Sequence, residues 1–159
     1  MKILLLYYSY GGNTHRVAQY IRKILDCDVQ EILTVTPYTG SYNSVVSQGQ
    51  REVDEGFEPP IRPMDKDLNN YDTIILGTPV WWYTFAPAVK TVLSAVDWNG
   101  KTVYPFATNG GWIGHTFRDI KAACVGADVK KGLNIYFEED KMRTAAEEID
   151  RWAEQIKED

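Results

Sequence analysis

The sequence has few cysteines and no surplus of positive charge. Cys27 and Cys124 are its two cysteines and form no CxxC pair, so we expect reduced structural thiols of a cytoplasmic protein. Lys and Arg total 17 against 22 Asp and Glu, a formal net charge of −5. An acidic chain without a basic cluster is a poor candidate for non-specific nucleic-acid binding, and we expect no nucleic-acid partner.

Long apolar runs are also missing. No run approaches the ~20 residues that a membrane span requires. The longest, residues 3–8, has the length of a strand and lacks the small-residue cleavage pattern of a secretory signal, so we expect no membrane association. Repeats and low-complexity linkers are absent as well. The 159 residues therefore predict one domain, residues 1–159.

Strand-like apolar runs alternate with stretches of helical period along the chain. Such alternation predicts an α/β fold with a parallel sheet and right-handed crossovers. The expected strands cover residues 3–8, 28–33, 73–77, 101–108 and 132–137. Helices are expected after Asn13 or Thr14 as the N-cap, from Pro87, around 117–124, and over a closing amphipathic stripe from Met142 to Ile156.

Two places resist this simple alternation. Pro105 lies inside an expected strand, where its missing N–H should cost a ladder hydrogen bond. The stretch 34–72 is too long for a simple crossover and has only a weak helical signal around 45–53. We interpret it as an excursion over the sheet edge that serves as a lid or a partner surface.

Three polar segments follow expected strand ends, and ligands of open parallel sheets bind at the carboxyl ends of strands. The first is Ser9-Tyr10-Gly11-Gly12-Asn13-Thr14, which joins a strand to a helix. Its hydroxyls, glycines and free helix-start N–H groups suit a phosphate monoester. Without a lysine it is not a nucleotide P-loop, and it lacks GxGxxG. An ordinary tight turn with an Asn or Thr cap is the alternative.

The other two segments are aromatic or rich in glycine. In Thr78-Pro79-Val80-Trp81-Trp82-Tyr83, neighbouring tryptophans of an extended chain point to opposite sides, so one should stay near the ligand edge. It can stack on a planar ring there, or cover the following helix. In Thr108-Asn109-Gly110-Gly111-Trp112-Ile113-Gly114, two adjacent glycines let a flat ligand approach the main chain, unless the segment is a glycine-rich connection without a ligand.

None of these three segments contains an acidic residue or a cysteine. A phosphoacceptor receiver site and a cysteine phosphatase are therefore excluded. His15 and His115 have no metal-ligand partner nearby in sequence, and no nucleophile–base–orienter set is visible. The sequence predicts a site that holds a ring and a phosphate and leaves the chemistry to the ligand, with no catalytic residue and no metal.

Residues 9–14 resemble the flavodoxin phosphate loop S/T-x-T-G-x-T. Residues 77–83 resemble the G-x-P-x-W-W segment of one branch of flavodoxin-like proteins, and residues 97–111 resemble its D-x-x-G-K…P-F-x-T-x-G-G signature. The resemblance covers nearly the whole chain. It implies a three-layer sandwich around five parallel strands in the order 2-1-3-4-5, and one non-covalent FMN.

The same resemblance implies the residues that bind FMN. The phosphate is expected at Ser9, Gly11, Gly12, Asn13 and Thr14. The isoalloxazine ring is expected between Pro79, Val80, Trp81, Trp82 and Tyr83 on one side and Thr108, Asn109, Gly110 and Gly111 on the other. Gly11 replaces the usual threonine of the phosphate loop, and Trp112 stands where this branch often has a small residue.

The expected function is electron transfer through a bound FMN. Two forms of it stay open: a carrier between redox partner proteins, and an NAD(P)H-dependent oxidoreductase acting on a quinone-like small acceptor. A flavin-free interaction module that keeps the fold ranks lower. The donor, the acceptor and the oligomeric state are not readable from the sequence.

Overall fold

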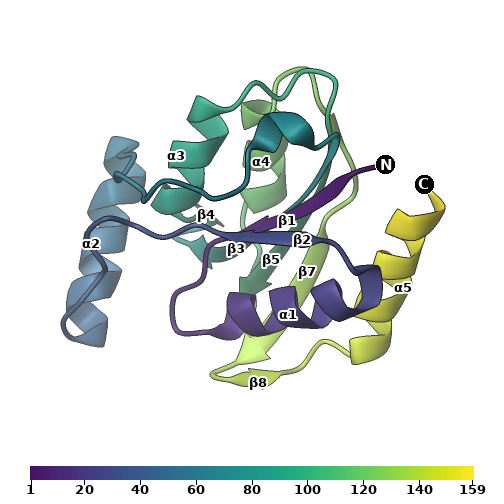
Figure 1. The fold of residues 1–159 in the computed structure, drawn as a ribbon. Coiled ribbons are helices and arrows are strands. Elements are labelled where there is room, and N and C mark those ends of the chain that lie inside the picture. Colours follow the sequence, from purple (N-terminus) through teal and green to yellow (C-terminus); the bar gives the residue numbers. More distant parts are fainter.

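A mainly parallel sheet lies between two helical layers in the computed structural model, which describes residues 1–159 (Figure 1). Its long strands lie in the spatial order β2-β1-β3-β5-β7. They are β1 (Ile3–Tyr7), β2 (Asp28–Glu31), β3 (Thr73–Trp81), β5 (Thr102–Asn109) and β7 (Leu133–Glu138). All four adjacent pairs are parallel. Counted along the chain, this is the predicted order 2-1-3-4-5, and the α/β flavodoxin-like fold class is confirmed.

The predicted total of five strands is wrong, because three two-residue strands join the sheet. They are β4 (Thr84–Phe85), β6 (Asp128–Val129) and β8 (Lys141–Met142). β4 and β8 pair antiparallel with β3 and β7, whereas β6 pairs parallel with β5. A two-residue strand has no readable periodicity. The prediction that the closing helix begins at Met142 is therefore wrong, because Met142 belongs to β8.

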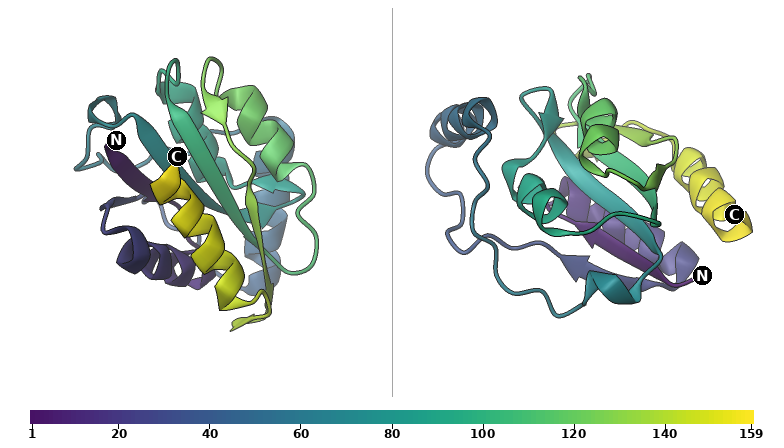
Figure 2. Two further views of the ribbon diagram at one scale, coloured as in Figure 1. Left: turned by 90° about the vertical axis from the view of Figure 1, so that its right-hand side faces the viewer. Right: turned by 90° about the horizontal axis from the view of Figure 1, so that it is seen from above.

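The helices cover both faces of the sheet (Figure 1 and Figure 2). α1 (Asn13–Leu25) and α5 (Ala146–Glu158) cover one face, while α3 (Pro87–Ala95) and α4 (Thr116–Ala123) cover the other. Successive residues of β1 therefore enter different cores: Leu5 packs with Val17 and Ile21, and Leu6 packs with Val89. This explains the continuous apolar run. No helix combines the length and the apolar character that a membrane crossing requires.

The excursion 34–72 contains a full helix, α2 (Tyr42–Glu55), where only a weak signal was visible. Ser41 caps it by accepting a hydrogen bond from Ser44 N at 3.1 Å, and Gly56 ends it with φ 66°. A single bridge between Thr34 and Ile61 closes the base of the excursion, before the short 3₁₀ helix η1 (Leu68–Asn70). α2 lies at the periphery of the molecule, beyond α3 (Figure 2).

Pro105 occupies the one stretch of β5 that lacks a neighbour on one side. β6 pairs with Thr102 and Val103, whereas β7 begins to pair only at Phe106. Lys130 N donates to Val103 O at 2.8 Å, so Val103 faces β6. Hydrogen-bonding directions alternate along a strand, so Pro105 faces the same side, in the interruption between β6 and β7. Its missing N–H therefore costs no ladder bond.

Candidate functional site

The carboxyl ends of β1, β3 and β5 lie side by side and bring the three polar segments together. Thr14 Oγ1, at the start of α1, lies 2.7 Å from Thr108 Oγ1, at the end of β5. Both threonines are buried. The first and third segments are therefore joined directly by a hydrogen bond, with the end of β3 beside them.

The first segment forms an open loop around two glycines with positive φ, 83° at Gly11 and 99° at Gly12. Gly12 is the N-cap of α1, so the expected Asn13 or Thr14 cap is wrong. Both side chains have distant partners instead: Asn13 Nδ2 donates to Glu139 O at 2.9 Å, and Thr14 bonds to Thr108. Because such partners lie about a hundred residues away in sequence, a local cap rule could not find them.

The loop itself carries main-chain N–H groups that have no hydrogen-bond acceptor in the protein. Gly11, Gly12, Asn13 and Thr14 donate no main-chain hydrogen bond within the protein, while His15 N donates to Ser9 Oγ at 3.1 Å. A Cβ built at Gly11 or Gly12 would meet nothing within 4 Å. The loop is therefore an open cradle of N–H groups at a helix N-terminus, which favours an anion.

Basic side chains next to the cradle are already engaged by the protein. His15 Nδ1 shares a hydrogen bond with Tyr7 Oη at 2.5 Å, and burial raises the pKa of Tyr7 to about 12. Arg16 Nη1 donates to Asp140 O at 2.9 Å. An anion in the cradle would consequently be held mainly by neutral donors, as the sequence predicts.

The second segment was expected to be a loop after a strand. It forms one side and the turn of a β-hairpin instead. β3 continues through Trp81, which pairs with Thr84 of β4, so Trp82 and Tyr83 alone make the turn. Their φ angles are 50° and 73°. A two-residue hairpin turn of this kind needs positive φ at both positions and usually contains Asn or Gly. Aromatic residues there are strained, by ~1–3 kcal/mol each.

Contacts from two other parts of the chain hold this strained turn. Trp82 Nε1 donates to Val46 O of α2 at 3.0 Å, and His115 N donates to Tyr83 O at 2.8 Å. A Cβ on Gly114 would lie 2.3 Å from Tyr83 O, so only glycine allows this approach. The turn is therefore fixed from both the α2 side and the α4 side.

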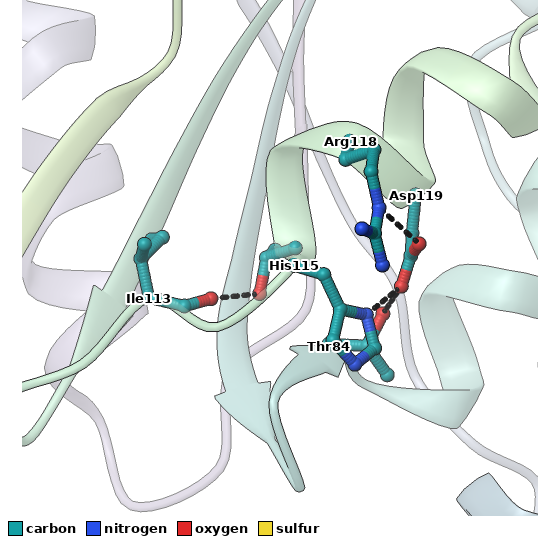
Figure 3. A network of polar contacts seen from close by, with 6 residues as sticks. Thr84, Ile113, His115, Arg118 and Asp119 are labelled. Carbon is teal, nitrogen blue, oxygen red and sulfur yellow. Dashed lines mark hydrogen bonds and ion pairs between the residues drawn. The ribbon is translucent and has the colours of Figure 1, made fainter.

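A polar network at the start of α4 anchors the strand that follows the turn (Figure 3). Thr84 Oγ1 donates to Asp119 Oδ2 at 2.6 Å, and His115 Nδ1 contacts the same carboxylate oxygen. Arg118 Nε lies 3.9 Å from the other oxygen of Asp119. His115 is the N-cap residue of α4, although its side chain makes no cap hydrogen bond.

The two neighbouring tryptophans diverge, as the strand geometry predicts. Trp81 packs edge-on against Tyr8, Tyr10 and Tyr38, with ring centroids 5.0–6.1 Å apart. Trp82 lies in the turn beside Tyr83 instead. Trp81 thus packs against tyrosines of the first segment and the excursion 34–72, whereas Trp82 lies between α2, which its indole N–H contacts, and the glycines of the third segment.

A pocket of about 250 Å³ separates the turn from the third segment; we call it the Gly110 pocket. It is lined by Val80, Trp82, Tyr83, Asn109, Gly110, Gly111 and Trp112. Asn109 shapes one wall by accepting a hydrogen bond from Gly111 N at 3.0 Å. The ring centroids of Tyr83 and Trp112 lie 4.9 Å apart, and 65% of Trp112 is exposed. No charged side chain lines this pocket.

Most of the fourteen predicted ligands gather in these two places. The cradle contains Ser9, Gly11, Gly12 and Asn13, and the Gly110 pocket contains Val80, Trp82, Tyr83, Asn109, Gly110 and Gly111. Thr14 adds its free N–H to the cradle while its side chain is buried against Thr108, Pro79 pairs with Thr108 inside the sheet, and Trp81 packs against tyrosines. The role of each as a cofactor ligand stays a prediction. Trp112, which is not among the fourteen, lines the Gly110 pocket as well.

Fold and site together define a flavodoxin-like α/β protein with an anion cradle beside an aromatic pocket. Residues 2–156 match the sequence profile of the flavodoxin family. The chain belongs to the flavodoxin family.

Solved structures of similar proteins cover almost the whole chain. A Bacteroides eggerthii DSM 20697 protein, classed provisionally as a flavoprotein, is 28% identical with a TM-score of 0.82, over 98% of both chains. A flavoprotein from Lactobacillus acidophilus NCFM, crystallised in complex with FMN, is 25% identical with a TM-score of 0.76, over 96% of this chain and 98% of the other.

One curated protein is similar over part of the chain. The uncharacterized NAD(P)H oxidoreductase YcaK of Escherichia coli K12 is 25% identical over 71 residues, 42% of this chain. The chain spans only 36% of the length of that relative.

Proposed function

We propose that this protein binds FMN non-covalently and transfers electrons through it. The observation that carries the proposal is the cradle of unpaired N–H groups at residues 11–14, placed beside an uncharged pocket of aromatic and glycine residues. The FMN complex of the Lactobacillus acidophilus relative supports it. FMN supplies reversible acceptance and release of electrons and protons at its ring.

The residues present fit such a group at both ends. Gly11 and Gly12 leave open space where side chains would block a phosphate, and the free N–H groups match its oxygens. The faces of Tyr83 and Trp112 and the bare main chain of Gly110 suit a flat ring. Ser9 and Asn109 hold the two loops in shape through their side-chain hydrogen bonds.

A titration of the cofactor-free protein with FMN tests the proposal. We expect tight binding that quenches tryptophan fluorescence and perturbs the visible FMN spectrum. Ser9→Asp places a negative charge at the cradle and should weaken FMN binding by about a hundredfold or more, while binding of riboflavin, which lacks the phosphate, should change little. A colourless protein with unquenched tryptophans after refolding with FMN would contradict the proposal.

An enzymatic form of the same function is the second candidate. It is favoured by the similarity to YcaK, which carries the description of an NAD(P)H oxidoreductase. Direct oxidation of NAD(P)H by the pure FMN-loaded protein supports the enzyme, whereas reduction only through a partner reductase supports the carrier. The partner is accordingly a redox protein or a small-molecule electron acceptor.

We place the protein in the cytoplasm. Both cysteines are free, and burial raises the pKa of Cys27 to about 11 and of Cys124 to about 12. Such thiols suit a reducing compartment, where they stay protonated and unpaired.

A further inference from the structure

A second pocket lies on the other side of the Trp82 turn, between predicted ring contacts of the hairpin and helix α2, which supplies none of the predicted ligands. This α2 pocket has a volume of about 280 Å³ and is bounded by Tyr42, Val46 and Gly49 of α2 and by Tyr10, Val80 and Trp81. Val80 and Trp82 also line the Gly110 pocket. The two pockets are therefore neighbours that share a wall.

Helix α2 is built to form this pocket. Val46 O accepts the Trp82 indole N–H at 3.0 Å, which fixes the helix against the turn. A Cβ on Gly49 would lie 3.1 Å from Trp81 Cε3, so glycine permits the close approach of α2 to the indole face. The result is a cleft between helix and hairpin rather than a filled interface. Its size is near the lower end of the range for small-molecule pockets, ~300–1,000 Å³.

The chemistry of the lining selects the occupant. No Lys, Arg, His, Asp or Glu lines the pocket, and seven of its eight residues are hydrophobic. The Trp82 N–H is already used by Val46 O. A dinucleotide would bring phosphates that have no cationic partner here, and burying an unpaired charge is costly. A neutral, flat and apolar molecule can instead meet aromatic faces and edges.

We propose that the α2 pocket binds a neutral planar aromatic molecule of the quinone class, next to the Gly110 pocket. The inference rests on the proposed function, because a quinone accepts electrons only if FMN is bound nearby. The wall of Val80 and Trp82, which both pockets share, places the quinone beside the predicted flavin ring. Tyr10 and Tyr42 stand at the mouth, 41% and 80% exposed, so the site is open to a small molecule from solvent. The excursion 34–72 thus provides the acceptor site.

The test is a binding titration that needs no turnover. The FMN-loaded, oxidised protein is titrated with 2-methyl-1,4-naphthoquinone while NMR follows the indole N–H signals and the amides of Val46 and Gly49. We expect saturable shifts at Trp81, Trp82 and α2. Val46→Phe fills the pocket and should weaken binding by about tenfold, and Tyr42→Ala should weaken it by a smaller factor without changing FMN affinity.

Control experiments distinguish a failure of the quinone site from a failure of FMN binding. Val125, 78% exposed in the turn after α4, provides a matched Val125→Phe variant that should bind as the wild type does. Equal quinone affinity in the wild type, Val46→Phe and Tyr42→Ala proteins would overturn the inference, as would shifts confined to Gly110 and Trp112. Sedimentation velocity that shows a dimer dissociated by Tyr42→Ala would also overturn it, because a second copy would then cover the pocket. Naphthoquinone shifts at α2 in a protein that binds no FMN would refute the proposed function and leave this site intact.

Discussion

The hydroxyls of Thr14 and Thr108 form a buried hydrogen bond, 2.7 Å long, between the start of α1 and the end of β5. Thr108→Val leaves the Thr14 hydroxyl without this partner and should lower the free energy of unfolding by about 1–3 kcal/mol. Because the double variant removes both polar groups, it should cost less than the sum of the single variants. Urea unfolding of the four proteins measures this, and additive losses would contradict the assignment.

The strained turn predicts an unusual gain in stability. Tyr83 has φ 73°, a conformation that glycine adopts without strain. Tyr83→Gly should therefore be more stable than Tyr83→Ala by about 1 kcal/mol, because both lose the contact with Trp112 but only alanine keeps the strain. Both should bind FMN more weakly than the wild type. Thermal unfolding compares the two variants, and equal melting temperatures would argue against backbone strain.

Gly77 lies under the ring of Phe106, where a Cβ would be 2.2 Å from Cζ. Gly77→Ala should accordingly destabilise the protein by about 1–3 kcal/mol, through overpacking of the sheet beneath the site. Adding Phe106→Leu should recover part of the loss, since leucine makes room for the methyl group. Gly110→Ala is the control: nothing lies within 4 Å of its Cβ, so unfolding should be unchanged.

Stability should fall with rising pH above the neutral range. Burial raises the pKa of Cys124 from 9.0 to about 12, and of Tyr7 from 10.0 to about 12. The unfolded chain loses these protons first, so their contribution is complete below about pH 9 and is lost as the pH approaches about 12. Urea unfolding between about pH 8 and about pH 10.5 should show the decline, with a shallower slope in Cys124→Ala. A flat profile would contradict the burial of these groups.

The uncharged lining of the Gly110 pocket predicts a low reduction potential. No cationic side chain is present to stabilise negative charge on reduced FMN. The bound cofactor should therefore have a midpoint potential below that of free FMN, and Gly110→Lys should raise it. Val125→Lys, at an exposed position in the turn after α4, is the charge-matched control. A spectroelectrochemical titration measures the midpoint potential of the bound FMN. A wild-type potential above that of free FMN would contradict this prediction.

The positions of the long strands were predictable from local apolar patterns, whereas their spatial order followed only from the resemblance of the three motifs to flavodoxin-like proteins. The stripe of Val17, Ala18 and Ile21 predicted a helix, and α1 buries these residues against β1. The three polar segments were likewise visible as strand ends. For Trp81 and Trp82, strand alternation predicted opposite sides, but Trp82 lies in a turn and both indoles approach Gly49 of α2.

The features that could not be predicted depend on contacts between residues far apart in the sequence. Asn13 is bound by the carbonyl of Glu139, so it does not cap α1. Trp82 and Tyr83 break the rule that such turns contain Asn or Gly, because α2 and Gly114 hold them from outside. Much of α2 faces solvent at the edge of the molecule, so the helix has few apolar residues and its helical pattern in the sequence is weak. Its contribution to a pocket becomes apparent only when the helix is docked.

The interruption of the sheet opposite Pro105 also has a use in protein engineering. After Lys130, whose N–H donates to Val103 O, residues 131 and 132 make no ladder hydrogen bond to β5, and Lys131 is exposed. A tether or reporter inserted between Lys130 and Lys131 would therefore lengthen a connection without removing a strand pairing. The resulting fusion would keep the carboxyl edge of the sheet free for attachment to an electrode or to a redox partner.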